Sequence, residues 1–128
     1  MPGEGIHIKN SIVIIDDSEV VAECIKNHLG MAGYSNVQVF TDPQEAIKNI
    51  QEYECPAFII TDFDMPGMNG VELLNTVFAA HPKASGLIVT SKSQDVLAIT
   101  ERYPVMSKNI MGFYDALIEH IRQQINTQ

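Results

Sequence analysis

Short apolar runs rich in β-branched residues alternate with helical patterns along this chain of 128 residues. Runs of this kind are typical of strands that are buried on both faces of a parallel sheet. The expected strands are residues 11–15, 37–40, 57–61, 87–89 and 105–106. Five strand–helix pairs in strict alternation predict an α/β fold, a doubly wound five-stranded parallel sheet with helices on both faces.

Capping residues and glycines indicate where the first three helices begin and end. Ser18 is a suitable N-cap for the first helix, and Gly33 is suited to end it. Asp42 followed by Pro43 gives the second helix a cap and a proline in its first turn. The third helix follows Gly70, and its expected inward residues are Val71, Leu74, Val77 and Phe78.

The last third of the chain leaves less room for helices. Residues 95–103 can hold only about two helical turns before Pro104. Asn109 is expected to cap the final helix, whose apolar stripe runs from Phe113 to Ile125.

The composition is that of one globular domain, with 45% hydrophobic and 19% charged residues. Residues 1–10 lack periodicity and form a loose lead-in, so the domain is expected to span residues 11–128. The formal charge of -8, without any basic cluster, disfavours nucleic acid or an anionic membrane as a direct partner. No secretory leader and no apolar run of about 18 residues is present, so a cytoplasmic location is expected.

The cysteines and histidines do not form a metal-binding pattern. Cys24 and Cys55 lack the spacing of zinc ligands, so both are expected to be thiols in a reducing compartment. The four histidines are scattered along the chain, and we interpret them as surface or helix-packing residues: His7, His28, His81 and His120.

The stretch from Ala57 to Gly70 ends a strand with a carboxylate. Its apolar start runs into Asp62, and the Asp, Pro, Gly and Asn residues that follow do not allow the strand to continue. Ligands bind at the carboxyl ends of the strands in an open parallel sheet, so Asp62 should face a crevice. A lone Asp after a strand is equally often just the start of a turn.

Polar groups also follow other expected strands: Asp16 and Asp17 the first, Thr90 the fourth and Lys108 the fifth. These groups converge with Asp62 if the sheet order places strands one, three, four and five side by side. Three carboxylates about 5 Å apart would repel by roughly 3 kcal/mol per pair at an effective dielectric of about 20, so such a group needs a cation. Oxygen ligands suit Mg²⁺ or Mn²⁺ better than zinc. A divalent ion, a lysine and a hydroxyl around Asp62 would stabilise a phosphoryl group on a nucleophilic carboxylate. The simpler interpretation is that each is a helix cap, a strand end or a solvated lysine.

The order of these residues resembles the receiver domain of two-component response regulators from Ser11 to Ile125. The similarity rests on the acidic pair, on the signature D-x-x-M-P-x-M-x-G that runs from Asp62 to Gly70, and on the Thr and Lys that follow later. It implies a flavodoxin-like (βα)5 three-layer sandwich that serves phosphorelay signal transduction. Such a domain is not an ordinary enzyme, although it assists its own phosphorylation and dephosphorylation.

The resemblance further implies a metal site and a phosphoryl acceptor. Asp17, Asp62 and the backbone carbonyl of Asp64 would bind Mg²⁺ directly, and Asp16 would bind it through water. Asp62 would accept the phosphoryl group from the phosphohistidine of a sensor histidine kinase or phosphotransfer protein.

Two further residues and the remaining partners follow from the same resemblance. Thr90 would hydrogen-bond a phosphoryl oxygen, and Lys108 would pair with the phosphoryl charge. An output domain or target protein is a further expected partner, and the domain itself would be a monomer or a weak phosphorylation-dependent dimer.

The chain departs from the family pattern at residues through which phosphorylation would change the conformation of the domain. Asn109 stands where the family usually has Pro, and Val105 stands where it often has a Tyr or Phe. Because Val is stiff at χ1 and has no ring to rotate, phosphorylation is expected to act through Thr90 and the loop 91–95 instead. Asp64 and Lys92 either pair across the mouth of the site or remain separately solvated, and an exposed pair contributes at most about 1 kcal/mol.

Two other functions compete with a phosphoryl acceptor. A haloacid dehalogenase-like phosphatase would use Asp62 as nucleophile and Asp64 as general acid, but nothing acidic follows Lys108 until Asp115, and the chain is short for that fold. The stronger alternative is a receiver-like module that binds a partner without being phosphorylated.

Overall fold

The computed structural model describes residues 11–52, 56–91 and 102–126. His7, Cys55, Lys92 and nearly all of the helix expected at 95–103 lie outside the described residues. The elements are β1 (Ile12–Ile15), α2 (Glu19–Met31), β2 (Val37–Phe40), α3 (Pro43–Glu52), β3 (Phe58–Asp62), α4 (Gly70–Ala80), β4 (Gly86–Thr90), β5 (Val105–Ser107) and α6 (Phe113–Asn126).

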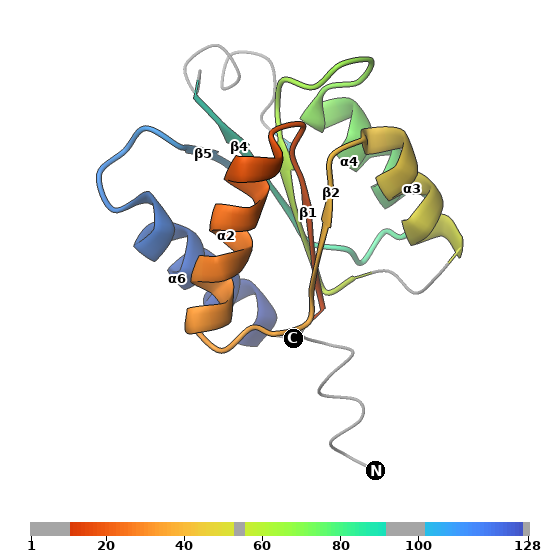
Figure 1. Ribbon diagram of the computed structural model, residues 1–128. Helices are drawn as coiled ribbons and strands as arrows, with labels where there is room; N and C mark the ends of the chain where they lie inside the picture. The colour runs from red at the N-terminus through yellow and green to blue at the C-terminus, as the bar shows by residue number, and fades with distance from the viewer. Residues whose placement is uncertain (1–10, 53–55, 92–101, 127–128) are drawn as a thin grey trace.

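All five strands form one parallel sheet in the order β2-β1-β3-β4-β5. Helices α2 and α6 cover one face of the sheet, and α3 and α4 cover the other (Figure 1). The predicted doubly wound, three-layer α/β fold is therefore confirmed. The order reverses beside β1, and the turn after β1 lies at the same end of the sheet as the loop after β3 (Figure 1).

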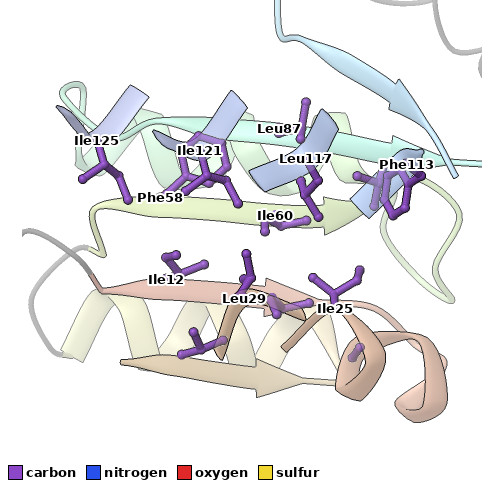
Figure 2. Packing of buried hydrophobic residues seen from close by; sticks show 14 residues of the cluster. Ile12, Ile25, Leu29, Phe58, Ile60, Leu87, Phe113, Leu117, Ile121 and Ile125 are labelled. Atoms are coloured by element: carbon purple, nitrogen blue, oxygen red, sulfur yellow. The ribbon is translucent and has the colours of Figure 1, made fainter. Parts of the chain in front are cut away.

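The sheet separates two hydrophobic cores. Alternate residues of each strand point to opposite faces, so Ile12 and Ile14 pack towards α2 and α6, and Val13 and Ile15 pack towards α3 and α4. Figure 2 shows the first core, in which Phe58 of β3 lies beside Ile121 and Ile125 in the stripe that α6 presents. That stripe consists of Phe113, Leu117, Ile121 and Ile125, all buried.

The predicted caps are present at the first two helices. The Ser18 Oγ accepts a hydrogen bond from the Val21 N–H at 3.3 Å, and Gly33 follows the helix end with φ +102°. At α3, Asp42 Oδ1 accepts from the Gln44 N–H at 3.1 Å. Side chains that satisfy the first N–H groups of a helix fix where it begins.

Three local predictions need correction. Asp62 and Thr90 are the last residues of β3 and β4, so they belong to the strands and do not follow them. In α4 the four residues predicted to face inward all pack in or against the second core, but Leu73, which was not predicted, is fully buried as well. Asn109 does not cap α6, because that helix begins at Phe113, after Gly112 turns the chain with φ +75°.

Two of the described histidines pack against aromatic rings, as expected of helix-packing residues. The His28 ring stacks on Tyr114 with 3.7 Å between ring centroids, and His120 meets Phe58 edge-on. Cys24 is a free thiol. None of the helices in the described part of the chain has the length and apolarity needed to cross a bilayer.

Candidate functional site

Adjacent strand ends bring the predicted polar residues together at one edge of the sheet. β1 lies beside β3, β3 beside β4, and β4 beside β5. The carboxyl ends of these strands carry Asp16, Asp62, Thr90 and Lys108, and Asp17 follows Asp16 in the turn to α2. Although Asp16 also helps to begin α2 and Asp62 ends a strand, these side chains lie together with Lys108 in one cluster.

Three carboxylates form the acidic part of the site. Asp16, Asp17 and Asp62 each have an oxygen within 4.8 Å of the oxygens of the other two. Asp16 is 1% exposed and Asp62 is 8% exposed, whereas Asp17 is open to solvent. Three like charges this close repel one another, so the arrangement favours a bound cation.

Both oxygens of Asp16 are already engaged within the protein. Oδ1 accepts a hydrogen bond from the Ser18 N–H at 2.9 Å, and Oδ2 lies 2.9 Å from the Lys108 ammonium. Asp16 therefore helps to begin α2 and to hold the lysine at the same time. A carboxylate used in this way has less freedom to coordinate a metal directly than the exposed Asp17 beside it.

Lys108 reaches across the edge of the sheet to two carboxylates. Its Nζ lies 2.9 Å from Asp16 Oδ2 and 3.1 Å from Asp62 Oδ1. Burial alone would lower the pKa of Lys108, but the hydrogen bonds and charges of Asp16 and Asp62 outweigh it and raise that pKa. The lysine is therefore a permanent cation beside Asp62.

The carboxyl group of Asp62 has a pKa well above its ordinary value. Burial raises the pKa of Asp62, the charge of Asp16 raises it further, and Lys108 opposes both, so that the pKa rises from 3.8 to about 6. Asp17 adds a smaller upward effect. Without another cation, a fraction of Asp62 is thus protonated near neutral pH.

This pKa predicts how the stability of the metal-free protein depends on pH. The folded state binds the Asp62 proton more tightly than the unfolded state, so the contribution to the unfolding free energy is complete below about pH 4 and is lost as the pH rises to about 6. After allowance for solvent screening at an open edge, we expect a loss of about 1–2 kcal/mol from this group. Urea unfolding in EDTA at several pH values measures it. Asp62→Asn is the control and should lack this component, and parallel curves for the two proteins would contradict the assignment.

The loop after Asp62 is fixed by the start of α4. Asn69 and Glu72 form a reciprocal capping box, with both hydrogen bonds at 2.9 Å. The Gly70 N–H donates to the Phe63 carbonyl at 2.9 Å, and a Cβ on Gly70 would lie 2.7 Å from the carbonyl oxygen of Asp62. Only glycine allows the helix to approach the backbone of Asp62 this closely.

The remaining predicted residues have different positions. Thr90 is buried at the end of β4, next to the segment that carries Lys108. Asp64 lies in the loop after Asp62 and is exposed. The direct contacts of Lys108 with Asp16 and Asp62 were not predicted, because the sequence shows only that the strand ends share an edge and not which side chains span it.

Comparison with known proteins agrees with this geometry. A protein-family model, the response regulator receiver domain, matches residues 12–108. This chain belongs to the response regulator receiver domain family. The family match includes every site residue named above and leaves the phosphatase hypothesis without support.

Individual relatives of the receiver family resemble part of the chain. The chemotaxis protein CheY-3 of Vibrio cholerae is 35% identical over 77 residues, which are 59% of this chain and 58% of that protein. The transcriptional regulatory protein HptR of Staphylococcus aureus is 35% identical over 82 residues, 62% of this chain and 31% of HptR. The matched stretch thus spans about three fifths of CheY-3 and about a third of HptR.

The fold has close structural neighbours. A response regulator receiver domain protein from Clostridium thermocellum superimposes with a TM-score of 0.78, covering 91% of this chain and 94% of the other at 24% identity. At that identity the likeness concerns the fold alone, which is the flavodoxin-like receiver fold.

Proposed function

We propose that this receiver domain takes a phosphoryl group onto Asp62 from a phosphohistidine, with a divalent cation bound beside it. The observation that carries the proposal is the placement of Asp62 between the Lys108 ammonium at 3.1 Å and the carboxylates of Asp16 and Asp17. The packing of α6 on the same sheet as β1 supports including residues 11–128 in one domain, beyond the family match at residue 108. A cytoplasmic location stays a prediction.

Phosphoryl transfer in this site is a substitution at phosphorus. An Asp62 oxygen donates an electron pair to phosphorus while the bond between phosphorus and the donor imidazole nitrogen breaks. The electron pair of the broken phosphorus–nitrogen bond stays on the imidazole, which then takes up a proton from solvent. Lys108 is placed to offset the negative charge on the phosphoryl oxygens, and Thr90 can offer its hydroxyl from the neighbouring strand end.

The donor groups fit Mg²⁺ or Mn²⁺. Both ions prefer oxygen ligands and retain water, and the site presents three carboxylates of which one is exposed. Asp17 and Asp62 would hold the ion directly, Asp16 would contact it through water because both of its oxygens are engaged, and the carbonyl of Asp64 is a further proposed ligand. The ion would neutralise negative charge on Asp62 and on the phosphoryl oxygens.

Incubation with acetyl phosphate and Mg²⁺, followed by intact-mass measurement, tests the function. A phosphoryl acceptor gains one labile phosphoryl group per chain. A module that binds its partner without phosphorylation gains none, and a phosphatase consumes acetyl phosphate without keeping the label. Absence of any mass gain in the well-folded, Mg²⁺-loaded protein would contradict the proposal.

An apolar surface beside the site suits a protein donor. Ile110 and Met111 lie two and three residues after Lys108 and are exposed, and Val20 is exposed at the start of α2. A groove of about 560 Å³ continues from Lys108 between Val21 and Tyr114. A protein that delivers a phosphohistidine to Asp62 must lie against this rim, so we propose it as the docking surface for a sensor histidine kinase or phosphotransfer protein.

Met111→Ala should therefore affect transfer from a protein donor more than labelling by a small molecule. Loss of an exposed apolar anchor is expected to slow transfer from a phosphohistidine protein by about tenfold and to leave labelling by acetyl phosphate within about twofold. Met31→Ala is the matched control, because Met31 is also exposed but lies at the opposite end of α2. Equal effects of the two substitutions on protein-mediated transfer would exclude this surface.

HptR is a transcriptional regulatory protein, and more than half of its length lies outside the matched stretch. We propose by analogy that the phosphorylated domain acts on an output domain or a target protein. The oligomeric state, a monomer or a weak phosphorylation-dependent dimer, remains a prediction.

A further inference from the structure

The hydrogen bonds between β4 and β5 continue past the ends of both strands. The Lys108 N–H donates to the carbonyl oxygen of Thr90 at 2.8 Å. One residue further along, the Nδ2 amide of Asn109 donates to the carbonyl oxygen of Ser91 at 3.0 Å. The side chain of Asn109 thus adds a rung to the ladder after the last residue of β5, Ser107.

The backbone of Asn109 is also hydrogen-bonded to Ser107, the last residue of β5. Its N–H donates to the Ser107 Oγ at 3.1 Å, and Ser107 is paired in register with Thr90. The segment from 107 to 109 is therefore joined to the segment from 90 to 91 at three successive positions. A backbone joined in this way has little freedom to shift along the edge of the sheet.

We propose that Asn109 is a positioning residue that locks the segment carrying Lys108 to the segment carrying Thr90. The Lys108 ammonium and the Thr90 hydroxyl, which would both contact a phosphoryl group, are then held at a fixed separation next to Asp62. This inference rests on the proposed function and deepens it, because it assigns the alignment of the lysine to a side chain outside the acidic cluster.

The physical reason is the length of the lysine side chain. Its four-carbon stem has many rotamers, so the place of the ammonium depends on where the backbone of Lys108 is held. The ammonium touches both Asp16 and Asp62 within 3.1 Å, which a small shift of the backbone would disturb. Because Asn109 is exposed, its hydrogen bond contributes little to global stability, and its effect should be confined to the site.

Binding of beryllofluoride, a mimic of the phosphoryl group, in the presence of Mg²⁺ tests this role. Asn109→Ala is expected to weaken beryllofluoride binding about fivefold, with an unchanged unfolding midpoint. Asn109→Asp keeps the shape but cannot donate to the Ser91 carbonyl, so the loss should be at least as large. Gln51→Ala removes an exposed amide at the far end of α3 and should change nothing. Wild-type affinity in both Asn109 variants would overturn the inference.

A double-mutant cycle with Lys108→Ala separates positioning from a general structural effect. If Asn109 acts by placing the ammonium, Asn109→Ala should change beryllofluoride affinity by less than about twofold once the lysine is gone. Additive losses in the cycle would mean that Asn109 acts on something else, which overturns the assignment.

Failure of the inference and failure of the function give different results. If the wild-type protein binds no beryllofluoride with Mg²⁺, the proposed function fails and the role of Asn109 fails with it. If the wild type binds and the Asn109 variants bind equally well, the proposed function stands and the positioning role alone is wrong.

Discussion

Asp62→Asn is expected to abolish phosphoryl uptake from acetyl phosphate, lowering the labelled fraction at least about 100-fold. The amide oxygen that replaces the carboxylate is not a nucleophile of useful strength, while the packing around it can stay unchanged. Lys108 contacts both Asp62 and Asp16, but both oxygens of Asp16 are already engaged, so Asp62 is the carboxylate that we propose as the acceptor. Intact mass after labelling, followed by peptide mapping of the wild-type protein, is the measurement.

Asp64→Asn is the matched control for that experiment. Asp64 stands two residues further along, in the loop after β3, and is exposed, so this variant should still take up one phosphoryl group. Recovery of the wild-type label on a peptide that lacks Asp62 would show that the acceptor has been assigned to the wrong residue.

Asp17→Asn should remove both Mg²⁺ binding and Mg²⁺-dependent labelling. Asp17 is the exposed member of the acidic cluster, whereas Asp16 already accepts hydrogen bonds at both oxygens. Loss of one charged ligand from a site with few protein ligands should weaken Mg²⁺ by more than about tenfold. The rise in the unfolding midpoint with added Mg²⁺ reports the affinity without reference to phosphorylation.

Asp42→Asn provides the comparison for Asp17→Asn. Asp42 is an exposed carboxylate directly before α3, outside the acidic cluster, and asparagine can keep its Oδ1 bond to the Gln44 N–H. The Mg²⁺-dependent shift should persist in this variant. A shift that also persists in Asp17→Asn would remove Asp17 from the metal site.

The fold could be predicted because the apolar runs, the helix caps and the alternation of strands and helices all indicate the same architecture. The run from Ile12 to Ile15 is apolar throughout, which in a short segment requires burial on both faces, and the structure buries all four residues. Ser18 and Gly33 locate α2 because capping chemistry is local. Parallel strands place their carboxyl ends at one edge, so the convergence of Asp16, Asp62 and Lys108 could be predicted on the condition that their strands are neighbours, and the observed strand order meets that condition.

Other features could not be predicted because they depend on contacts between distant segments. Asn109 resembles an N-cap by residue type, yet its side chain finds the Ser91 carbonyl across the sheet edge, and Gly112 delays the helix. Leu73 of α4 is fully buried because α3 packs beside that helix and widens its buried face. The sequence also did not show that Asp16 binds Lys108 directly.

Because of the order of the strands, the segment that carries the Lys108 ammonium should unfold locally at a lower free energy than the segments that carry the carboxylates. Asp16 directly follows β1 and Asp62 ends β3, and both strands lie in the interior of the sheet, whereas Lys108 follows β5, a three-residue edge strand whose residues are all partly exposed. Short edge segments detach at lower free energy than interior strands, so amide exchange should find an opened form in which β5 has left β4. In that form the carboxylates remain together and the ammonium is absent, so under the proposed function we expect the protein to bind a phosphoryl group more weakly while it still binds a cation.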